Sequence, residues 1–433
     1  MKTLFANADI LTEENGSYVT LRSAYLGIDD DKICYIGTER PPEQFDCVRD
    51  FSGKLLIPGL INGHTHSPMT LLRGLGSDQP LQSWLYDYIF PVEDRMRPQD
   101  IRAGSELALL EMLSTGTTSF TDMYYVTEQT AEVCIAAGIK ANLCRPVQEF
   151  DPDGKPENNY RIKESLELFK AYHHAAHDLI RIDFSIHAEY TSTEATVRYY
   201  SELCEENHGR MHLHLSETRS EHEECIQRHG KTPAEYFRDC GTFRSPTAAA
   251  HCIWVTDSDV DIFAENGVTV MNNPTSNMKL GSGFAPIEKF HRRGVNVSLG
   301  TDGAASNNNL NMFEELHLAS VIYNGFKIDA TPMTPAYTFA MATCNGALQQ
   351  GRDDTGSLLV GKKADIVAID LCKPHLFPHF DTLATLAYTA QGSDVYMTMV
   401  NGRVLYENGE YKTLDAERIM AQAAESVSYL GIG

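Results

Sequence analysis

The sequence predicts an α/β fold, namely a (β/α)8 TIM barrel joined to a small β-sandwich domain that both chain ends build. Between residues 58 and 355, short apolar runs alternate with amphipathic helical patterns, and eight such units imply a closed parallel barrel. Residues 1–57 and 356–412 instead show short strands separated by turns, and residues 413–433 are predicted to form a final helix. A doubly wound open sheet is the alternative, but no Gly-x-Gly-x-x-Gly motif follows the first barrel strand.

Size and composition limit the classes of protein that fit. At 433 residues the chain exceeds the usual size of one hydrophobic core. A net charge of −23 argues against nucleic acid or an anionic membrane as a partner. No stretch is long and apolar enough for a membrane span or a signal peptide. The ten cysteines form no Cys-x-x-Cys pair, which favours reduced thiols in a cytoplasmic protein.

The elements of the predicted small domain lie at the two ends of the chain. Residues 24–28 and 32–37 flank three aspartates and form a predicted hairpin. Asn401-Gly402 is a tight-turn dipeptide between two later strands. Asp415 is placed to cap the last helix. The C-terminal elements are predicted at residues 364–369, 395–400, 403–406 and 415–430.

The barrel elements follow from apolar runs and helix signals. A helix that begins at Pro98 and ends near Gly116 separates the first two strands, because proline is favoured in the first helical turn. Two more helices are predicted at residues 311–320 and 335–350, after the last strand. The first barrel strand ends at residues 64–66, and the other seven are predicted at 117–123, 140–147, 181–189, 211–217, 247–253, 268–273 and 295–302.

A His-x-His pair ends the first barrel strand. Side chains alternate along an extended strand, so His64 and His66 point to the same side and are able to share one metal ion. Two ordinary polar residues leaving a strand would look the same. The later strand ends decide between these interpretations, because they carry further residues of the metal-binding and proton-transfer types, which are His187, His214, Glu217, His251 and Asp302.

Barrel enzymes place their chemistry at the carboxyl ends of the strands, so these side chains are expected to converge. Three histidines and one carboxylate suit Zn²⁺ or a similar divalent ion, with Fe²⁺ and Mn²⁺ as alternatives and one position left for water. The predicted ligands are His64, His66, His214 and Asp302. Glu217 lies three residues after His214 and is the predicted proton shuttle, and His251 is predicted to orient the attacking water.

Less specific interpretations remain for several of these residues. His212 shares a strand face with His214, so the two are able to exchange the roles of ligand and packed neighbour. Asp302 alone would be taken for a turn residue. His187 and His251 are also compatible with hydrogen-bonded core histidines. Glu93 and Arg145 would individually be taken for surface residues.

These motifs resemble those of the amidohydrolase superfamily over nearly the whole chain. Residues 58–66 (PGLINGHTH) resemble the opening motif, and 214–218 (HLSET), 250–252 (AHC) and 299–303 (LGTDG) resemble the later ones. Residues 356–367 (GSLLVGKKADIV) resemble the return to the β domain. The His-x-x-Glu pattern implies the one-metal deaminase and chlorohydrolase branch. The two-metal branches need a lysine at the end of strand four, which this sequence lacks.

Within that branch the chain is similar to the 5-methylthioadenosine/S-adenosylhomocysteine deaminases, in residues 67–74 (SPMTLLRG), 81–85 (LQSWL) and 89–93 (IFPVE). The resemblance implies hydrolytic deamination of a 6-aminopurine nucleoside by Glu217, Asp302 and His251, and relatives are often homo-oligomers. By the same resemblance, Glu93 would bind the ribose hydroxyls, and Arg145 and Arg161 would bind the homocysteine carboxylate. His187 would contact the nucleoside, and Trp84 would pack on the sugar or the thioether.

One residue departs from the pattern. Those deaminases usually read HAPYT where this chain has HAEYT at residues 187–191. Glu189 is therefore expected near the cavity mouth, where it would reject an anionic substrate tail or attract a basic one. The alternatives are deamination of guanine or a pterin, and dechlorination of a triazine. A non-catalytic binding barrel is a further alternative, against which the complete set of ligands and the proton shuttle argue.

Overall fold

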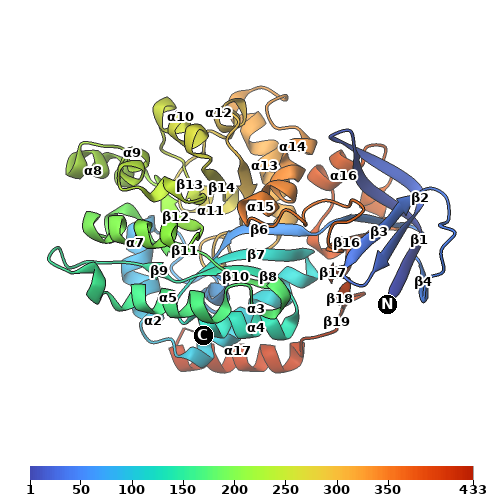
Figure 1. Ribbon diagram of the computed structural model, residues 1–433, viewed down its shortest axis with the longest axis horizontal. Coiled ribbons are helices and arrows are strands. Elements are labelled where there is room, and N and C mark those ends of the chain that lie inside the picture. The colour runs from blue at the N-terminus through green and yellow to red at the C-terminus, as the bar shows by residue number, and fades with distance from the viewer. Residues whose placement is uncertain (433) are drawn as a thin grey trace.

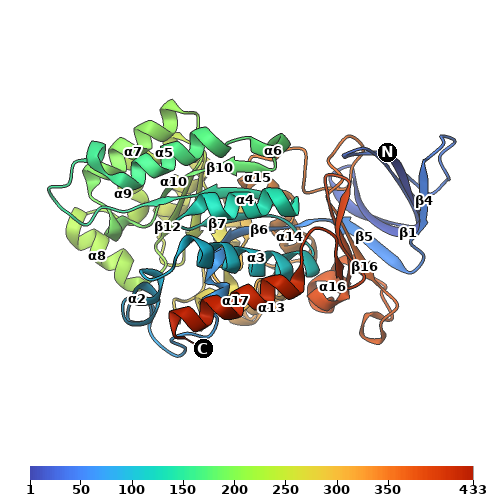
Figure 2. The same ribbon diagram turned by 90° about the horizontal axis from the view of Figure 1, so that it is seen from below.

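The two ends of the chain form one sheet, and the residues between them form a barrel beside it (Figure 1). The computed structural model describes residues 1–432. Figure 2 shows the same division from below, with β1 and β16 together at one end of the molecule and the helices around the barrel at the other. No helix within residues 1–432 has the length and apolar character needed to cross a membrane.

The sheet made by the chain ends has nine strands in the order β19-β18-β17-β16-β5-β1-β2-β3, with β4 paired to β1. The predicted hairpin is confirmed, because β2 and β3 pair antiparallel. Apolar residues of both chain ends share one core, for example Phe5, Leu56 and Ile366. The strands are β1 (Lys2–Glu14), β2 (Ser17–Asp29), β3 (Lys32–Gly37), β4 (Cys47–Asp50), β5 (Lys54–Pro58), β16 (Ile366–Asp370), β17 (Val395–Val400), β18 (Arg403–Glu407) and β19 (Glu410–Tyr411).

The barrel consists of parallel strands, as the alternation of apolar runs and helices predicted. Its third and fourth strands are each broken into two short pieces. The barrel closes where the backbone N–H of Asp302 donates a hydrogen bond of 2.9 Å to the carbonyl of His64. The strands are β6 (Leu60–Thr65), β7 (Thr117–Met123), β8 (Lys140–Cys144), β9 (Pro146–Val147), β10 (Ile180–Ile182), β11 (Phe184–Ile186), β12 (Met211–Leu215), β13 (Thr247–His251), β14 (Thr269–Asn272) and β15 (Val297–Leu299).

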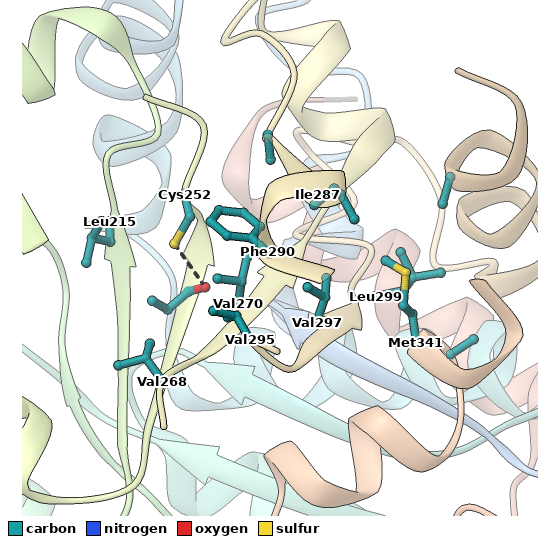
Figure 3. Close-up of a cluster of buried hydrophobic side chains, with 14 of the residues drawn as sticks. Leu215, Cys252, Val268, Val270, Ile287, Phe290, Val295, Val297, Leu299 and Met341 are labelled. Atoms are coloured by element: carbon teal, nitrogen blue, oxygen red, sulfur yellow. Dashed lines mark hydrogen bonds between the residues drawn. The ribbon is translucent and has the colours of Figure 1, made fainter. Parts of the chain in front are cut away.

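Helices cover the outside of the barrel, and an apolar layer separates them from the strands. Figure 3 shows part of that layer, in which Phe290 from a helix packs near Val270 and Val297 from strands β14 and β15. Burial of such side chains supplies most of the stability of an amphipathic helix in a protein. The longer helices are α3 (Pro98–Ser114), α4 (Thr127–Ala137), α5 (Tyr160–Tyr172), α7 (Glu194–Glu206), α8 (Arg219–His229), α10 (Asp257–Asn266) and α13 (Met312–Lys327).

Shorter helices fill the connections between these elements. The predicted helix at 335–350 is interrupted at residues 342–343 and forms α14 and α15. The α-helices are α1 (Leu81–Ser83), α2 (Phe90–Glu93), α6 (Ala175–Asp178), α9 (Pro233–Asp239), α11 (Pro274–Lys279), α12 (Ile287–Arg292), α14 (Pro335–Met341), α15 (Cys344–Gln349) and α16 (Thr382–Tyr388). The others are η1 (Ser67–Leu72), η2 (Trp84–Ile89), η3 (Pro156–Asn158), η4 (Glu189–Thr191), η5 (Thr242–Arg244), η6 (Pro374–Leu376) and η7 (Gly392–Asp394).

The last helix, α17 (Ala416–Leu430), packs along α3. The predicted cap is confirmed, because the Asp415 side chain accepts a hydrogen bond from the backbone N–H of Arg418. The division of the chain after residues 57, 355 and 412 stays a prediction. Strand β5 ends at Pro58 and β6 begins at Leu60, so the sheet and the barrel are joined without a linker.

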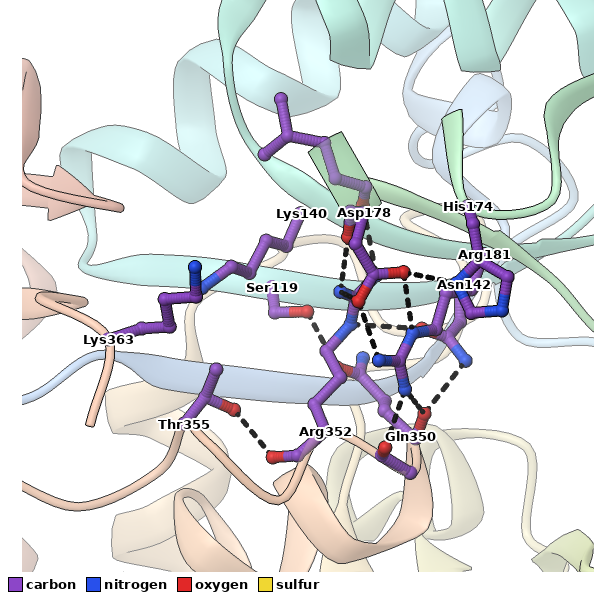
Figure 4. Close-up of polar contacts among 12 residues, drawn as sticks. Ser119, Lys140, Asn142, His174, Asp178, Arg181, Gln350, Arg352, Thr355 and Lys363 are labelled. Atoms are coloured by element: carbon purple, nitrogen blue, oxygen red, sulfur yellow. Dashed lines mark hydrogen bonds and ion pairs between the residues drawn. The ribbon is translucent and has the colours of Figure 1, made fainter. Parts of the chain in front are cut away.

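A buried polar network closes the end of the barrel at which the strands begin (Figure 4). Arg352 is almost fully buried and donates hydrogen bonds to the carbonyls of Ala141, Asp178 and Leu179. Lys140, at the start of β8, pairs with Asp365 just before β16. Each buried charge therefore has hydrogen-bond partners, as buried charges require. The functional residues lie at the opposite end, where the strands finish.

Candidate active site

Five polar side chains at the carboxyl ends of the barrel strands converge on one point. His64 lies in β6 and His66 directly follows that strand, His214 comes from β12 and His251 from β13, and Asp302 follows β15. The ring nitrogens of His64, His66 and His214 that face one another lie within 4.8 Å, and so do the facing atoms of His64, His251 and Asp302. The Oδ1 atom of Asp302 is 3.2 Å from Nε2 of His66 and 3.6 Å from Nε2 of His64.

Hydrogen bonds on the outer side of each ring fix how the histidines face the centre. Nδ1 of His66 donates to the carbonyl of Met123 at 2.6 Å. Nδ1 of His214 donates to the carbonyl of His187 at 2.8 Å. Nδ1 of His64 lies 2.9 Å from Nε2 of His212. The inner Nε2 atoms are therefore free for a ligand, which is how metal-binding histidines are usually oriented.

The centre fits a cation. Within residues 1–432, Nε2 of His64 is buried without a hydrogen-bond partner, which is costly unless another group binds there. The Asp302 carboxylate accepts hydrogen bonds from Ser276 Oγ at 2.6 Å and from the N–H of Gly303 at 2.7 Å. Burial favours its neutral form, but the hydrogen bond and charge of His66 hold the pKa of Asp302 well below its usual range. Three imidazoles and a carboxylate are a donor set that Zn²⁺ accepts.

Two acidic residues stand beside this centre. Burial raises the pKa of Glu217, against the positive influence of His251, whose Nε2 lies 3.8 Å from Glu217 Oε2. Glu221, near the start of α8, accepts hydrogen bonds from the backbone N–H groups of Ser216 and Glu217 at 2.9 and 2.8 Å. Ser216 has a φ of 48°, so the chain turns sharply at that residue. The Glu221 carboxylate thus fixes the backbone from which the Glu217 side chain projects.

One cavity of about 990 Å³ opens over the centre. It is large enough for a nucleoside with a substituent, because ligand pockets usually span about 300–1,000 Å³. Its walls include His66, His214, His251 and Asp302. The structure also brings every predicted substrate contact to this cavity, and these residues are Trp84, Glu93, Arg145, Arg161, His187 and Glu217.

Glu93 is the buried carboxylate of this wall. The hydroxyl of Tyr124 donates a hydrogen bond of 2.5 Å to Glu93 Oε1. Burial raises the pKa of Glu93 to about 7, although the bond from Tyr124 and the charge of His66 oppose the shift. The Tyr125 ring stacks on the Tyr124 ring with their centroids 4.3 Å apart. Glu93 thus lines the cavity with one oxygen held by Tyr124, which itself stacks on Tyr125.

The other predicted contacts have defined partners as well. Arg145 donates through Nε to Glu164 Oε2 at 2.9 Å and through Nη1 to the carbonyl of Pro146. The Arg161 guanidinium lies over the ring of Tyr160, 4.6 Å from its centroid. The indole N–H of Trp84 donates to the carbonyl of Leu75, so its ring offers the cavity an apolar face. Burial lowers the pKa of His187 to about 4, and its ring is neutral at pH 7.

Comparison with known proteins places this site in a family. Residues 55–405 match the sequence profile of the Amidohydrolase family. A 5-methylthioadenosine/S-adenosylhomocysteine deaminase of Thermoanaerobacter pseudethanolicus is 42% identical over 422 residues, which are 97% of each chain. The chain belongs to the amidohydrolase family. The resemblance found in the motifs is thus confirmed over nearly the full length.

Other relatives of this amidohydrolase carry related names. A 5′-deoxyadenosine deaminase of Methanothermobacter thermautotrophicus is 39% identical over 95% of each chain. Among solved structures, an adenosine deaminase of Xanthomonas campestris with bound zinc matches with a TM-score of 0.92 and 30% identity, over 100% of this chain and 99% of that one. An atrazine chlorohydrolase of Arthrobacter aurescens, 23% identical over 98% of this chain and 100% of that one, shares the fold with a TM-score of 0.91.

The prediction for Glu189 in this amidohydrolase is wrong. The side chain is buried and, within residues 1–432, is not among those that line the cavity. Its carboxylate accepts hydrogen bonds from Arg228 Nη2 at 2.6 Å and from His229 Nε2 at 2.8 Å. Both partners come from the end of α8, which packs over the loop that follows β11. The charge is therefore neutralised below the surface of the cavity and does not meet a substrate tail.

Sequence reasoning missed residues that act through a neighbour. It did not single out Tyr124, Glu164 or Glu221, and it left the order of His212 and His214 open. In the structure His212 lies behind His64, and His214 faces the centre. A signal existed for Glu221, because Thr218 and Glu221 have the Ser/Thr-x-x-Glu spacing of a capping box. Tyr124 and Glu164 carry no local signal, since their partners are far away in the sequence.

Proposed function

We propose that this amidohydrolase is a hydrolytic deaminase of 6-aminopurine nucleosides, with 5-methylthioadenosine and S-adenosylhomocysteine as its substrates. The products would be the corresponding inosyl compounds and ammonia. The observation that carries the proposal is that the histidine and aspartate centre and the buried Glu93 face one cavity. The relatives that are 41–42% identical and bear this name support the same substrates.

One divalent ion, Zn²⁺ in preference to Fe²⁺ or Mn²⁺, would be held by His64, His66, His214 and Asp302. When bound, such an ion lowers the pKa of a coordinated water to about 7 in favourable sites and so makes a nucleophile available at neutral pH. The zinc in the Xanthomonas campestris adenosine deaminase supports this choice. The buried Nε2 atom of His64, which has no hydrogen-bond partner within residues 1–432, supports placing the ion among these four residues.

Three side chains would move or orient protons. Glu217, whose pKa burial raises, would act as the acid that protonates the purine ring nitrogen beside the amino carbon. Asp302 stays ionised and accepts the proton of the attacking water. His251 donates through Nδ1 to Asn277 Oδ1 at 2.8 Å, so its Nε2 is left to accept a hydrogen bond from that water and orient it. As the bond between the purine carbon and the amino group breaks, Glu217 or Asp302 gives a proton to the amino group, which leaves as ammonia.

The remaining wall residues would bind the nucleoside. As a carboxylate, Glu93 accepts hydrogen bonds from both ribose hydroxyls. His187 contacts the nucleoside, and the apolar face of Trp84 packs on the sugar or the thioether. Arg145 and Arg161 meet the homocysteine carboxylate, a pairing that suits the planar guanidinium group.

A second candidate substrate is 5′-deoxyadenosine, because several relatives that are 38–39% identical bear that name. It would use the same centre and the same Glu93. Deamination of guanine or a pterin, and dechlorination of a triazine, would leave Glu93 and Arg145 without a role. A non-catalytic binding barrel would bind nucleosides without releasing ammonia.

The test is ammonia release by the zinc-loaded protein with adenosine, 5′-deoxyadenosine, 5-methylthioadenosine, S-adenosylhomocysteine, guanine and a pterin in parallel. We expect turnover of the nucleosides and none of the free bases. Glu93→Ala should lower kcat/KM for the nucleosides by at least about tenfold, since a charged hydrogen bond to the ribose is lost. Activity on a free base alone, or full nucleoside turnover by Glu93→Ala, would contradict the assignment.

A further inference from the structure

The cavity wall contains an ion pair between a buried arginine, Arg145, and a half-exposed glutamate, Glu164. Arg145 follows β8 and is nine-tenths buried, whereas the Glu164 side chain on α5 is half exposed. Their contact of 2.9 Å joins the cavity wall to the helix that borders its mouth. Both residues line the cavity. The cavity wall therefore has a guanidinium group and a carboxylate next to each other.

A run of contacts connects this pair to the reaction centre. His66 is near enough to Glu93 to influence its pKa, and Tyr124 bonds to Glu93. Tyr125 stacks on Tyr124, and the charge of Arg145 in turn influences the pKa of Tyr125. Arg145 and Glu164 line the same cavity as Glu93 and the metal-site residues. A substituent on the 5′ carbon of a nucleoside bound in that cavity is therefore able to reach the pair.

Each member of the pair keeps hydrogen-bonding capacity. Arg145 uses Nε for Glu164 and Nη1 for the Pro146 carbonyl, so the N–H groups of Nη2 have no partner within the described chain. Glu164 accepts only through Oε2 in the same contact, which leaves Oε1 free. A guanidinium is able to bind a carboxylate and a carboxylate is able to bind an ammonium group, both through charge-assisted hydrogen bonds.

We propose that Arg145 and Glu164 together form a site for a zwitterion, the α-amino acid end of a substituent on the nucleoside 5′ carbon. Arg145 binds the carboxylate of that tail, and Glu164 binds its ammonium group. This inference rests on the proposed nucleoside deaminase function and adds Glu164 to it as a residue that determines specificity.

The Arg145–Glu164 pair should also select substrates by the charges on the 5′ substituent. A neutral tail, such as a methylthio group, leaves Arg145 and Glu164 satisfied by each other. A tail with both charges satisfies both residues. A tail with only a carboxylate is repelled by Glu164, and a tail with only an amine is repelled by Arg145. One site thus accepts neutral and zwitterionic tails and discriminates against singly charged ones, because unpaired like charges oppose binding.

The experiment compares kcat/KM for four nucleosides that differ only in the tail. They are 5-methylthioadenosine, S-adenosylhomocysteine, its 3-carboxypropyl analogue without the amino group, and its 3-aminopropyl analogue without the carboxylate. We expect the wild-type protein to prefer the first two over each singly charged analogue by about two- to fivefold, the range of partly exposed ion pairs. Glu164→Gln should bring the ratio of S-adenosylhomocysteine to the carboxypropyl analogue close to unity.

Glu157→Gln is the matched control. Glu157 is exposed, lies in the short helix before α5 and is not among the cavity-lining residues within 1–432, so its substitution should leave that ratio unmoved. Turnover of 5-methylthioadenosine with a ratio that Glu164→Gln does not change would reject the zwitterion site and leave the deaminase proposal standing. Equal wild-type use of all four tails would also reject it. Failure of every nucleoside to release ammonia would reject both.

Discussion

His212 supports His64 from behind, with its Nε2 atom 2.9 Å from Nδ1 of His64. Burial lowers the pKa of His212 to about 3, so this ring is neutral and acts as a hydrogen-bond partner without adding charge. The contact fixes the orientation in which Nε2 of His64 faces His66, His214 and Asp302.

His212→Ala should therefore weaken metal binding about 10- to 100-fold, as loss of a partner behind a metal-binding histidine typically does. Competition with a chelator, followed by measurement of the zinc that the protein retains, would give the affinity. His208→Asn is the control, because His208 is exposed and has a φ of 51° that asparagine tolerates. Equal zinc affinity in wild type and His212→Ala would show that the contact has no such role.

Tyr124→Phe should shift the pH dependence of nucleoside turnover upward. Glu93 binds ribose hydroxyls as a carboxylate, and its pKa of about 7 means that kcat/KM should rise as the pH passes through neutrality. The hydrogen bond from Tyr124 favours the carboxylate, so its removal raises the pKa of Glu93 further. The pH profile of kcat/KM for 5-methylthioadenosine from pH 5.5 to 9 tests this. Tyr388→Phe, at an exposed residue of α16, should keep the wild-type profile.

Glu221→Gln should lower kcat about tenfold with little change in KM, because it disturbs the backbone that carries Glu217. A glutamine amide can accept only one of the two backbone N–H groups and turns a donor toward the other. Steady-state kinetics with 5-methylthioadenosine would separate the two constants. Glu223→Gln, an exposed residue on the same helix, is the comparison. A change confined to KM would mean that Glu221 acts on substrate binding instead.

Glu315 should make the protein less stable as the pH rises. Burial raises the pKa of Glu315 to about 8, so between about pH 4.5 and 8 the folded state keeps a proton that the unfolded chain has released. The free energy of unfolding therefore falls across this window, by up to about 1.4 kcal/mol for each unit of pKa shift. Glu315→Gln cannot ionise, so its stability relative to wild type should increase between pH 5 and 8 in denaturant unfolding. Parallel pH profiles would contradict this.

Features of the fold and the site that depend on local sequence pattern could be predicted from the sequence. His64, His66, His214, His251 and Asp302 follow apolar runs, and the parallel barrel brings strand ends together, so their convergence could be deduced. The hairpin before residue 37 and the cap at Asp415 also follow from local rules.

Contacts between distant segments could not be deduced in the same way. Strand pattern does not reveal that Arg228 and His229 neutralise Glu189, because these residues meet only when α8 folds over the loop after β11. The bond from Tyr124 to Glu93 likewise joins the residue after β7 to the short helix α2 in an earlier connection. The resemblance to known deaminases named Glu93 and Arg145, but not the partners that set their charge and orientation.

The sheet that joins the two chain ends has a consequence for how the protein is made. Lys54 in β5 pairs with Asp370 in β16, 316 positions later. During synthesis the N-terminal strands emerge first, and the edge of β5 stays without its partner until all strands of the barrel have been translated. An unpaired strand edge can add strands of other chains. Newly made chains should thus be prone to association until translation reaches β16, and a truncation before residue 366 should expose the same edge permanently.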